Sequence, residues 1–83
     1  MSQKGRTPDE KFLIQLHRAT EESEDASVGI EMQEVGSFLG QKETAVKNIV
    51  KHLAQANFVK KLSGTAIVLT PHGRNFVLKE LGF

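Results

Sequence analysis

A chain of 83 residues, 39% hydrophobic and 25% charged, has room for one small core, because a domain of this size buries roughly 60% of its unfolded surface. The absence of cysteine excludes disulfides and thiolate metal sites and is typical of a reducing compartment. No apolar run approaches the roughly 20 residues of a membrane span, and no hydrophobic segment typical of a secretory signal follows Met1. We therefore expect a cytoplasmic protein without a membrane partner.

The net charge of +1 is unevenly distributed along the chain. Two basic and eight acidic side chains give residues 9–34 a net charge of −6, whereas seven basic and two acidic ones give residues 35–83 a charge of +5. This asymmetry indicates either one face suited to a polyanion or a solvated surface on which the charges are segregated by accident.

The first predicted element is a helix that begins after a polar tail. We expect residues 1–6 to form this flexible tail and residues 7–83 to form one domain. Thr7 suits the N-cap, Pro8 suits the first helical position, and Glu10 completes a capping box. The sequence therefore predicts a helix that starts here.

This first helix is predicted to continue to about residue 22, because apolar side chains recur at helical spacing. They are Phe12, Leu13, Leu16 and Ala19. Ile14 lies off this stripe, so we expect it to contact either a second element or a partner. Residues 23–27 are polar and predict a linker, and residues 28–30 predict a very short strand.

A second helix is predicted from Glu31. Its inner face is expected to carry Val35, Phe38 and Leu39. Gly36 lies inside this helix, where glycine costs about 1 kcal/mol relative to alanine, so we expect a neighbouring helix to approach closely there. Gly40 ends the helix, because glycine readily takes the left-handed conformation that follows a helix.

A third helix is predicted over residues 43–56 and is ended by Asn57. Its apolar side chains follow the i, i+3, i+4, i+7 spacing of an amphipathic helix and are Val46, Ile49, Val50 and Leu53. The opposite face is polar and lacks acidic residues; it carries Thr44, Lys47, Asn48, Lys51 and Gln55.

The pattern then changes to that of a β-hairpin over residues 58–69. Two strand-like runs, at 58–62 and 65–69, flank the turn residues Ser63-Gly64. Thr70 and Pro71 then predict the start of a last short helix, because they repeat the N-cap and proline pattern of the first helix. The chain as a whole is predicted to form an α+β fold that is mostly helical.

The sequence carries no spacing typical of a catalytic or metal site. His17, His52 and His72 are scattered and lack metal-ligand spacing. The acidic segment 21–25 lacks the spacing of a calcium loop. The residues around Ser63 are not typical of a catalytic nucleophile. We expect neither an enzyme nor a protein that holds a metal or another cofactor.

Several short stretches carry a family resemblance through their order and spacing. They are Glu34-Val35, Phe38-Leu39-Gly40, Thr44-Ala45-Val46, Leu53, Asn57-Phe58-Val59 and Leu69-Thr70-Pro71-His72-Gly73-Arg74. Over residues 28–82 the chain resembles the winged-helix (winged helix-turn-helix) family of small prokaryotic transcriptional regulators of the MarR-like type. The resemblance implies a three-helix core, a short β-hairpin wing and a short C-terminal helix. Gln41 departs from the pattern, because the family usually has an apolar residue there.

The resemblance also implies double-stranded DNA as the partner of a transcriptional regulator, with helix 43–56 in the major groove and the 58–69 hairpin as wing. The residues expected to contact DNA are Thr44, Lys47, Asn48, Lys51, Gln55, Lys60, Lys61 and Arg74. One of the two wing lysines is expected to face inward or sideways. Arg74 is expected to contact a phosphate, to cap a helix or to pair with an acidic neighbour.

A protein-docking module without DNA binding is the alternative, because one fold serves many functions. In that case the acidic first half or Ile14 would mark the interface with a protein partner. The terminal helices are shorter than those that join dimers in larger family members. We therefore expect a monomer or a weak homodimer, with Ile14 as the candidate apolar contact on the first helix.

Overall fold

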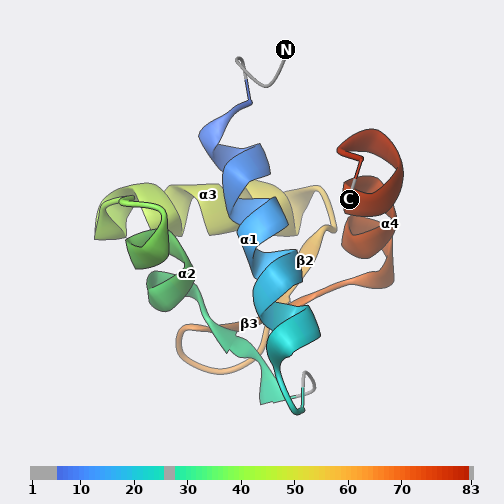
Figure 1. The fold of residues 1–83 in the computed structure, drawn as a ribbon. Helices are drawn as coiled ribbons and strands as arrows, with labels where there is room; N and C mark the ends of the chain where they lie inside the picture. Colours follow the sequence, from blue (N-terminus) through green and yellow to red (C-terminus); the bar gives the residue numbers. More distant parts are fainter. Residues whose placement is uncertain (1–5, 26–27, 83) are drawn as a thin grey trace.

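The computed structural model describes residues 6–25 and 28–82. In these residues, four helices and a three-stranded antiparallel sheet form an α+β fold that is mostly helical, as predicted (Figure 1). The elements are α1 (Pro8–Glu22), β1 (Ile30–Glu31), α2 (Met32–Phe38), α3 (Glu43–Gln55), β2 (Val59–Lys61), β3 (Ala66–Leu69) and α4 (Pro71–Glu80). Of the predicted tail, residues 1–5 lie outside the described residues, and Arg6 donates a hydrogen bond from Nη2 to the Leu81 carbonyl at 3.3 Å.

Both predicted helix starts are confirmed by their hydrogen bonds. At α1, the Thr7 hydroxyl accepts from the Glu10 N–H, and the Glu10 carboxylate accepts from the Thr7 N–H, each at 3.1 Å. At α4, the Thr70 hydroxyl accepts from the Gly73 N–H at 2.9 Å. Proline occupies the first turn of both helices, where its missing N–H costs nothing because that donor would have no partner in the helix.

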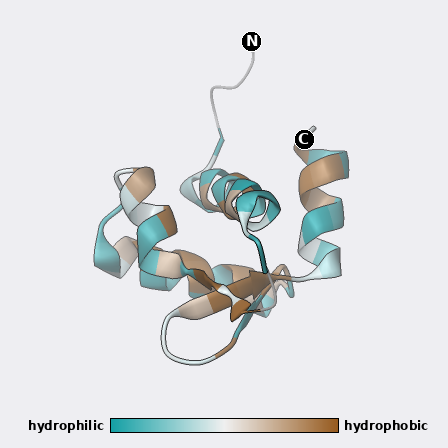
Figure 2. Ribbon diagram, turned by 60° about the horizontal axis from the view of Figure 1, so that its bottom comes forward, coloured by the Kyte–Doolittle hydropathy of each residue, from teal (hydrophilic) through white to brown (hydrophobic). Residues whose placement is uncertain are grey.

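The sheet has the strand order β1-β3-β2, and both neighbouring pairs are antiparallel. Ile30 pairs with Ile67, so β1 begins two residues later than predicted, and Val28 lies before it with 66% of its surface exposed. Residues 26–27 of the predicted linker lie outside the described residues. Figure 2, in which α1 is seen nearly end on, shows the hydrophobic stretches of the strands below that helix. The sheet thus closes one side of the core.

The core forms where α1, α2, α3 and the sheet meet. Its buried side chains are Phe12, Leu13, Leu16, Met32, Val35, Val46, Ile49, Val50, Leu53, Val59, Ile67 and Val77. The predicted apolar stripes of α1 and α3 are thereby confirmed, apart from the half-buried Ala19. Ile14 is only 8% exposed within the single chain. This burial leaves it little surface for a dimer contact or a docking contact.

Helix α2 approaches α3 at Gly36, as predicted. A Cβ atom placed on Gly36 would lie only 2.1 Å from Cγ2 of Val46. Gly40 has a φ of +73°, which ends α2 as expected, and the Gln41 N–H donates to the Gly36 carbonyl at 2.8 Å. The tight turn between α2 and α3 therefore depends on two glycines for different reasons, a close contact and a left-handed backbone.

The prediction that Phe38 lies on the inner face of α2 is wrong, because 73% of its surface is exposed. The contact with α3 through Gly36 decides which side of α2 faces inward. At 100° per residue, Phe38 lies roughly 110° from the centre of the face formed by Val35, Gly36 and their buried neighbours. Leu39 does pack against the core, as predicted.

The Gly36 contact leads to a test by substitution. We expect Gly36→Ala to lower the free energy of unfolding, because forced overpacking costs roughly 1–3 kcal/mol and outweighs a gain of about 1 kcal/mol in helix propensity. Adding Val46→Ala removes the methyl group that the new Cβ meets, so the double variant should be more stable than the two single losses predict. Urea unfolding followed by circular dichroism measures both. Strictly additive losses would contradict the contact.

Candidate nucleic-acid interface

All five residues of the polar face predicted for α3 are exposed. Its five side chains are Thr44, Lys47, Asn48, Lys51 and Gln55, and each is largely open to solvent. They lie opposite the stripe that packs against α1. In Figure 1, α1 crosses in front of α3, so this polar face points away from the viewer. The structure therefore brings these five predicted residues together on one solvent-facing surface.

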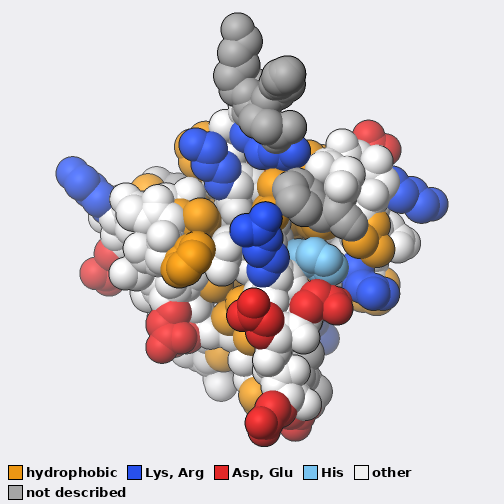
Figure 3. Space-filling view, in the orientation of Figure 1, with side chains coloured by type: hydrophobic (Ala, Val, Ile, Leu, Met, Phe, Trp, Pro, Cys, Tyr) orange, Lys and Arg blue, Asp and Glu red, His pale blue; other side chains and the backbone are white. Residues whose placement is uncertain are grey.

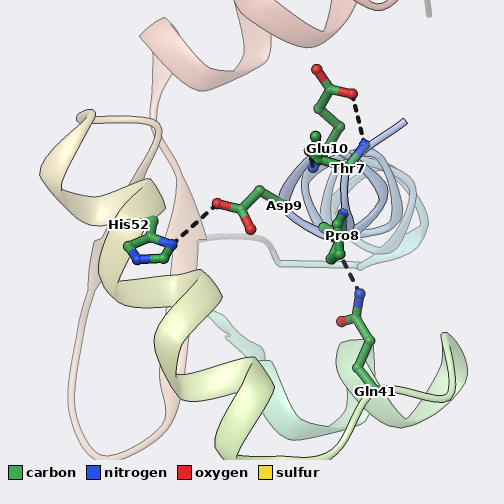
Figure 4. A network of polar contacts seen from close by, with 6 residues as sticks. All are labelled: Thr7, Pro8, Asp9, Glu10, Gln41 and His52. Atoms are coloured by element: carbon green, nitrogen blue, oxygen red, sulfur yellow. Dashed lines mark hydrogen bonds and ion pairs between the residues drawn. The ribbon is translucent and has the colours of Figure 1, made fainter. Parts of the chain in front are cut away.

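The start of α3 is held by backbone contacts and by the first turn of α1. Lys42 occupies the N-cap without a side-chain hydrogen bond, and its carbonyl accepts from the Val46 N–H at 2.9 Å. Gln41, which departs from the family pattern, donates from Nε2 to the Pro8 carbonyl at 3.4 Å (Figure 4). The polar residue at this position thus ties the turn before α3 to α1.

Lys47 has one acidic neighbour on its own helix. Its Nζ lies 3.5 Å from Glu43 Oε2, in an i, i+4 pair whose side chains are 61% and 71% exposed. Exposed pairs of this kind contribute roughly 0.3–0.5 kcal/mol, because water screens the two charges. Glu43 also suits the first turn of a helix, where a negative charge is favourable. This weak pair leaves Lys47 available to an outside anion.

The two hairpin lysines, Lys60 and Lys61, are exposed, so neither is turned into the core. Lys61 pairs with Ile67 across the sheet and therefore shares the inner face with Val59, but it remains open to solvent. Lys60 pairs with Val68 on the outer face. Because α1 packs on the inner face of the sheet, Lys60 and the polar face of α3 both lie on the side away from α1.

Arg74 does not join this surface. Its Nε lies 3.9 Å from Glu21 Oε2 on α1, with both side chains more than half exposed. Arg74 therefore has an acidic neighbour, which is one of the alternatives predicted for it. Since α1 covers the opposite side of α3, Arg74 is separated from the polar face and is not part of the candidate interface.

Lys42 occupies the position at which the family usually has a serine or threonine cap. Lys42 is exposed and directly precedes α3. Its side chain has no capping role, because lysine lacks the acceptor oxygen that an N-cap requires. The first N–H groups of α3 are therefore left without a side-chain cap.

The opposite side of the molecule carries charges of both signs. Figure 3 shows the face that α1 covers, where Lys and Arg side chains are spread over the upper and middle part and acidic side chains gather around the lower, C-terminal end of that helix. Glu21, Glu22, Glu24 and Asp25 belong to this end and are all exposed. The uneven charge in the sequence therefore places an acidic region on the side of α1, away from Lys47 and Lys51.

The histidines lie apart from one another. His52 Nδ1 lies 3.4 Å from Asp9 Oδ2, and the His72 ring stacks on Phe58 with 5.0 Å between the ring centres. Within residues 6–25 and 28–82, no three His, Asp or Glu side chains are grouped as ligands for a metal ion. No helix in this part of the chain has the length and apolar character needed to cross a membrane.

Comparison of the chain with protein-family models, with curated proteins and with solved structures finds no significant match.

The weakness of the Glu43–Lys47 pair is testable by a double-mutant cycle. We expect Glu43→Ala and Lys47→Ala each to change the free energy of unfolding by less than about 0.5 kcal/mol, with a coupling energy of at most about 0.5 kcal/mol. Chemical denaturation of the two single variants and the double variant gives the coupling. A coupling energy above 1 kcal/mol would mean that Lys47 is held by Glu43 and is unavailable to an anion.

Proposed function

We propose that this protein is a winged helix-turn-helix domain that binds double-stranded DNA as a transcriptional regulator, with α3 in the major groove. The observation that carries the proposal is the exposed polar face of α3, which has two lysines one turn apart and no acidic residue among its five side chains. The major groove of DNA admits an α-helix, and α3 at about 1.5 Å per residue has a length of roughly 20 Å.

Each side chain on this face has chemistry suited to a part of the duplex. Lys47 and Lys51 are suited to phosphates or to guanine edges. Asn48, on the same face, is suited to the two-point hydrogen bonding that an adenine edge offers. Thr44 lies near the N-terminal end of α3, the end that reaches base edges in helix-turn-helix proteins. Phosphate contacts supply affinity, whereas base contacts supply sequence preference.

The hairpin is proposed as the wing, with Lys60 as its phosphate contact. Lys60 lies on the same side of the molecule as the polar face of α3, whereas Lys61 lies on the inner face of the sheet. Arg74 is left out of the proposed contact because it lies on α4, which packs beside α1, and not on the polar face of α3. We further propose that the domain acts as a monomer or a weak homodimer, since Ile14 is buried.

A protein-docking module is the second candidate, and Phe38 is the observation that favours it. An exposed aromatic side chain is typical of contact surfaces between proteins, and Phe38 is 73% exposed at the end of α2. Ile14 gives this candidate no support, because it is buried. The DNA titrations below separate the two candidates.

DNA binding through α3 predicts a specific response to salt. Titration of a labelled duplex at several salt concentrations should show a steep fall in affinity, because bound lysines displace counterions from DNA. Lys47→Ala and Lys51→Ala should each flatten the log–log slope by about 0.9. Asn48→Ala should leave the slope unchanged and, on its preferred duplex, cost roughly 1–3 kcal/mol.

Lys11→Ala is the matched control for these variants. Lys11 is an exposed lysine of α1, on the other side of the core, and its loss changes the net charge by the same amount. It should leave the salt slope unchanged. Equal affinity of all variants and wild type, or no binding at low salt, would exclude α3 as the DNA-contacting element and favour the docking module.

The two wing lysines give an independent prediction because they lie on opposite faces of one strand. Lys60→Ala should flatten the salt slope by about 0.9, and Lys61→Ala should change it by much less. The same titrations measure both. A larger effect at Lys61 than at Lys60 would contradict the proposed position of the hairpin against DNA.

A further inference from the structure

A small pocket lies apart from the polar face of α3, where the start of α1, the end of α3 and the aromatic residues beside them meet. Its volume is about 160 Å³. The lining residues are Asp9, Glu10, Leu13, His52, Leu53, Ala56, Phe58 and Phe76. This volume is below the roughly 300–1,000 Å³ of sites for drug-sized ligands, so an occupant would be a small molecule with about one ring.

The walls of the pocket are mainly apolar and aromatic. Leu13 and Leu53 belong to the buried core. The Phe58 and Phe76 rings stack with 4.6 Å between their centres, and both remain half-buried, so they are not sealed inside the core.

The charged part of the pocket is acidic. Figure 4 shows Asp9 projecting from α1 toward His52 of α3, with one carboxylate oxygen directed at the imidazole and the other pointing away. Glu10 uses one oxygen to accept from the Thr7 N–H. No lysine or arginine is among the lining residues. A bound molecule therefore meets two carboxylates and two phenyl rings without a fixed positive side chain.

We propose that this pocket binds a small organic cation, an amine attached to one apolar ring or short chain, with the ammonium group at Asp9 and the apolar part against Phe58 and Phe76. An anion is disfavoured by Asp9 and Glu10, and a neutral molecule of the same shape forgoes the attraction to the carboxylates. His52 links the pocket to α3, because it lies in the last turns of the helix that carries the proposed DNA contacts. The proposal itself does not depend on DNA binding.

Three probes of similar shape and different charge test this proposal on the 83-residue chain. Benzylamine, benzyl alcohol and benzoate are titrated into ¹⁵N-labelled protein at pH 8. We expect saturable shifts of the Asp9, Leu13 and Phe58 amides with benzylamine. Binding of benzyl alcohol should be at least tenfold weaker, and benzoate should not bind.

Two carboxylate variants distinguish binding in this pocket from general attraction to acidic side chains. Asp9→Asn keeps the shape of the side chain and removes its charge, so it should weaken benzylamine binding about tenfold. Glu34→Gln removes an exposed charge from α2, away from the pocket, and should have no effect. Equal binding of the three probes, no binding of benzylamine, or equal loss in the two variants would each overturn the proposal.

Discussion

The packing of α3 against α1 decides what this molecule can present to a partner. Val46, Ile49, Val50 and Leu53 are all at most 5% exposed, and full burial of such a side chain contributes roughly 1.5–3 kcal/mol. Small domains are stable by only about 5–15 kcal/mol in total. A rotation of α3 about its axis would therefore cost much of the stability, and the lysines of its other face are held toward solvent.

The position of α2 follows from the same constraint. Gly36 lets α2 approach Val46 more closely than any side chain allows, and this close approach turns Phe38 outward. The turn that follows is tied to α1 through Gln41. Helices α1 and α2 thus hold α3 and leave its polar side uncovered, which is the arrangement that a groove-binding helix requires.

The distribution of charge and the proposed sites agree with one another. Lysines lie on the face of α3 that points away from α1, whereas acidic side chains gather at the C-terminal end of α1 and at the pocket beside its first turn. A polyanion and a small cation would therefore bind to different surfaces of one small domain. His52 lies on α3 and faces Asp9, so the two proposed sites share a helix without sharing a surface.

Local sequence patterns determined the elements whose signals lie within a few residues, because caps and helical periodicity act over one or two turns. The capping box at Thr7 and the two faces of α3 were predicted in this way. The same patterns predicted most of the residues of the candidate site. Only the tertiary structure decided the features that depend on contacts between distant segments. Phe38 is exposed because α2 meets α3 through Gly36, and Arg74 is removed from the candidate interface because α4 packs beside α1 near Glu21. No local sequence pattern predicts the Gly36–Val46 and Arg74–Glu21 contacts, because these residues become neighbours only when the helices pack.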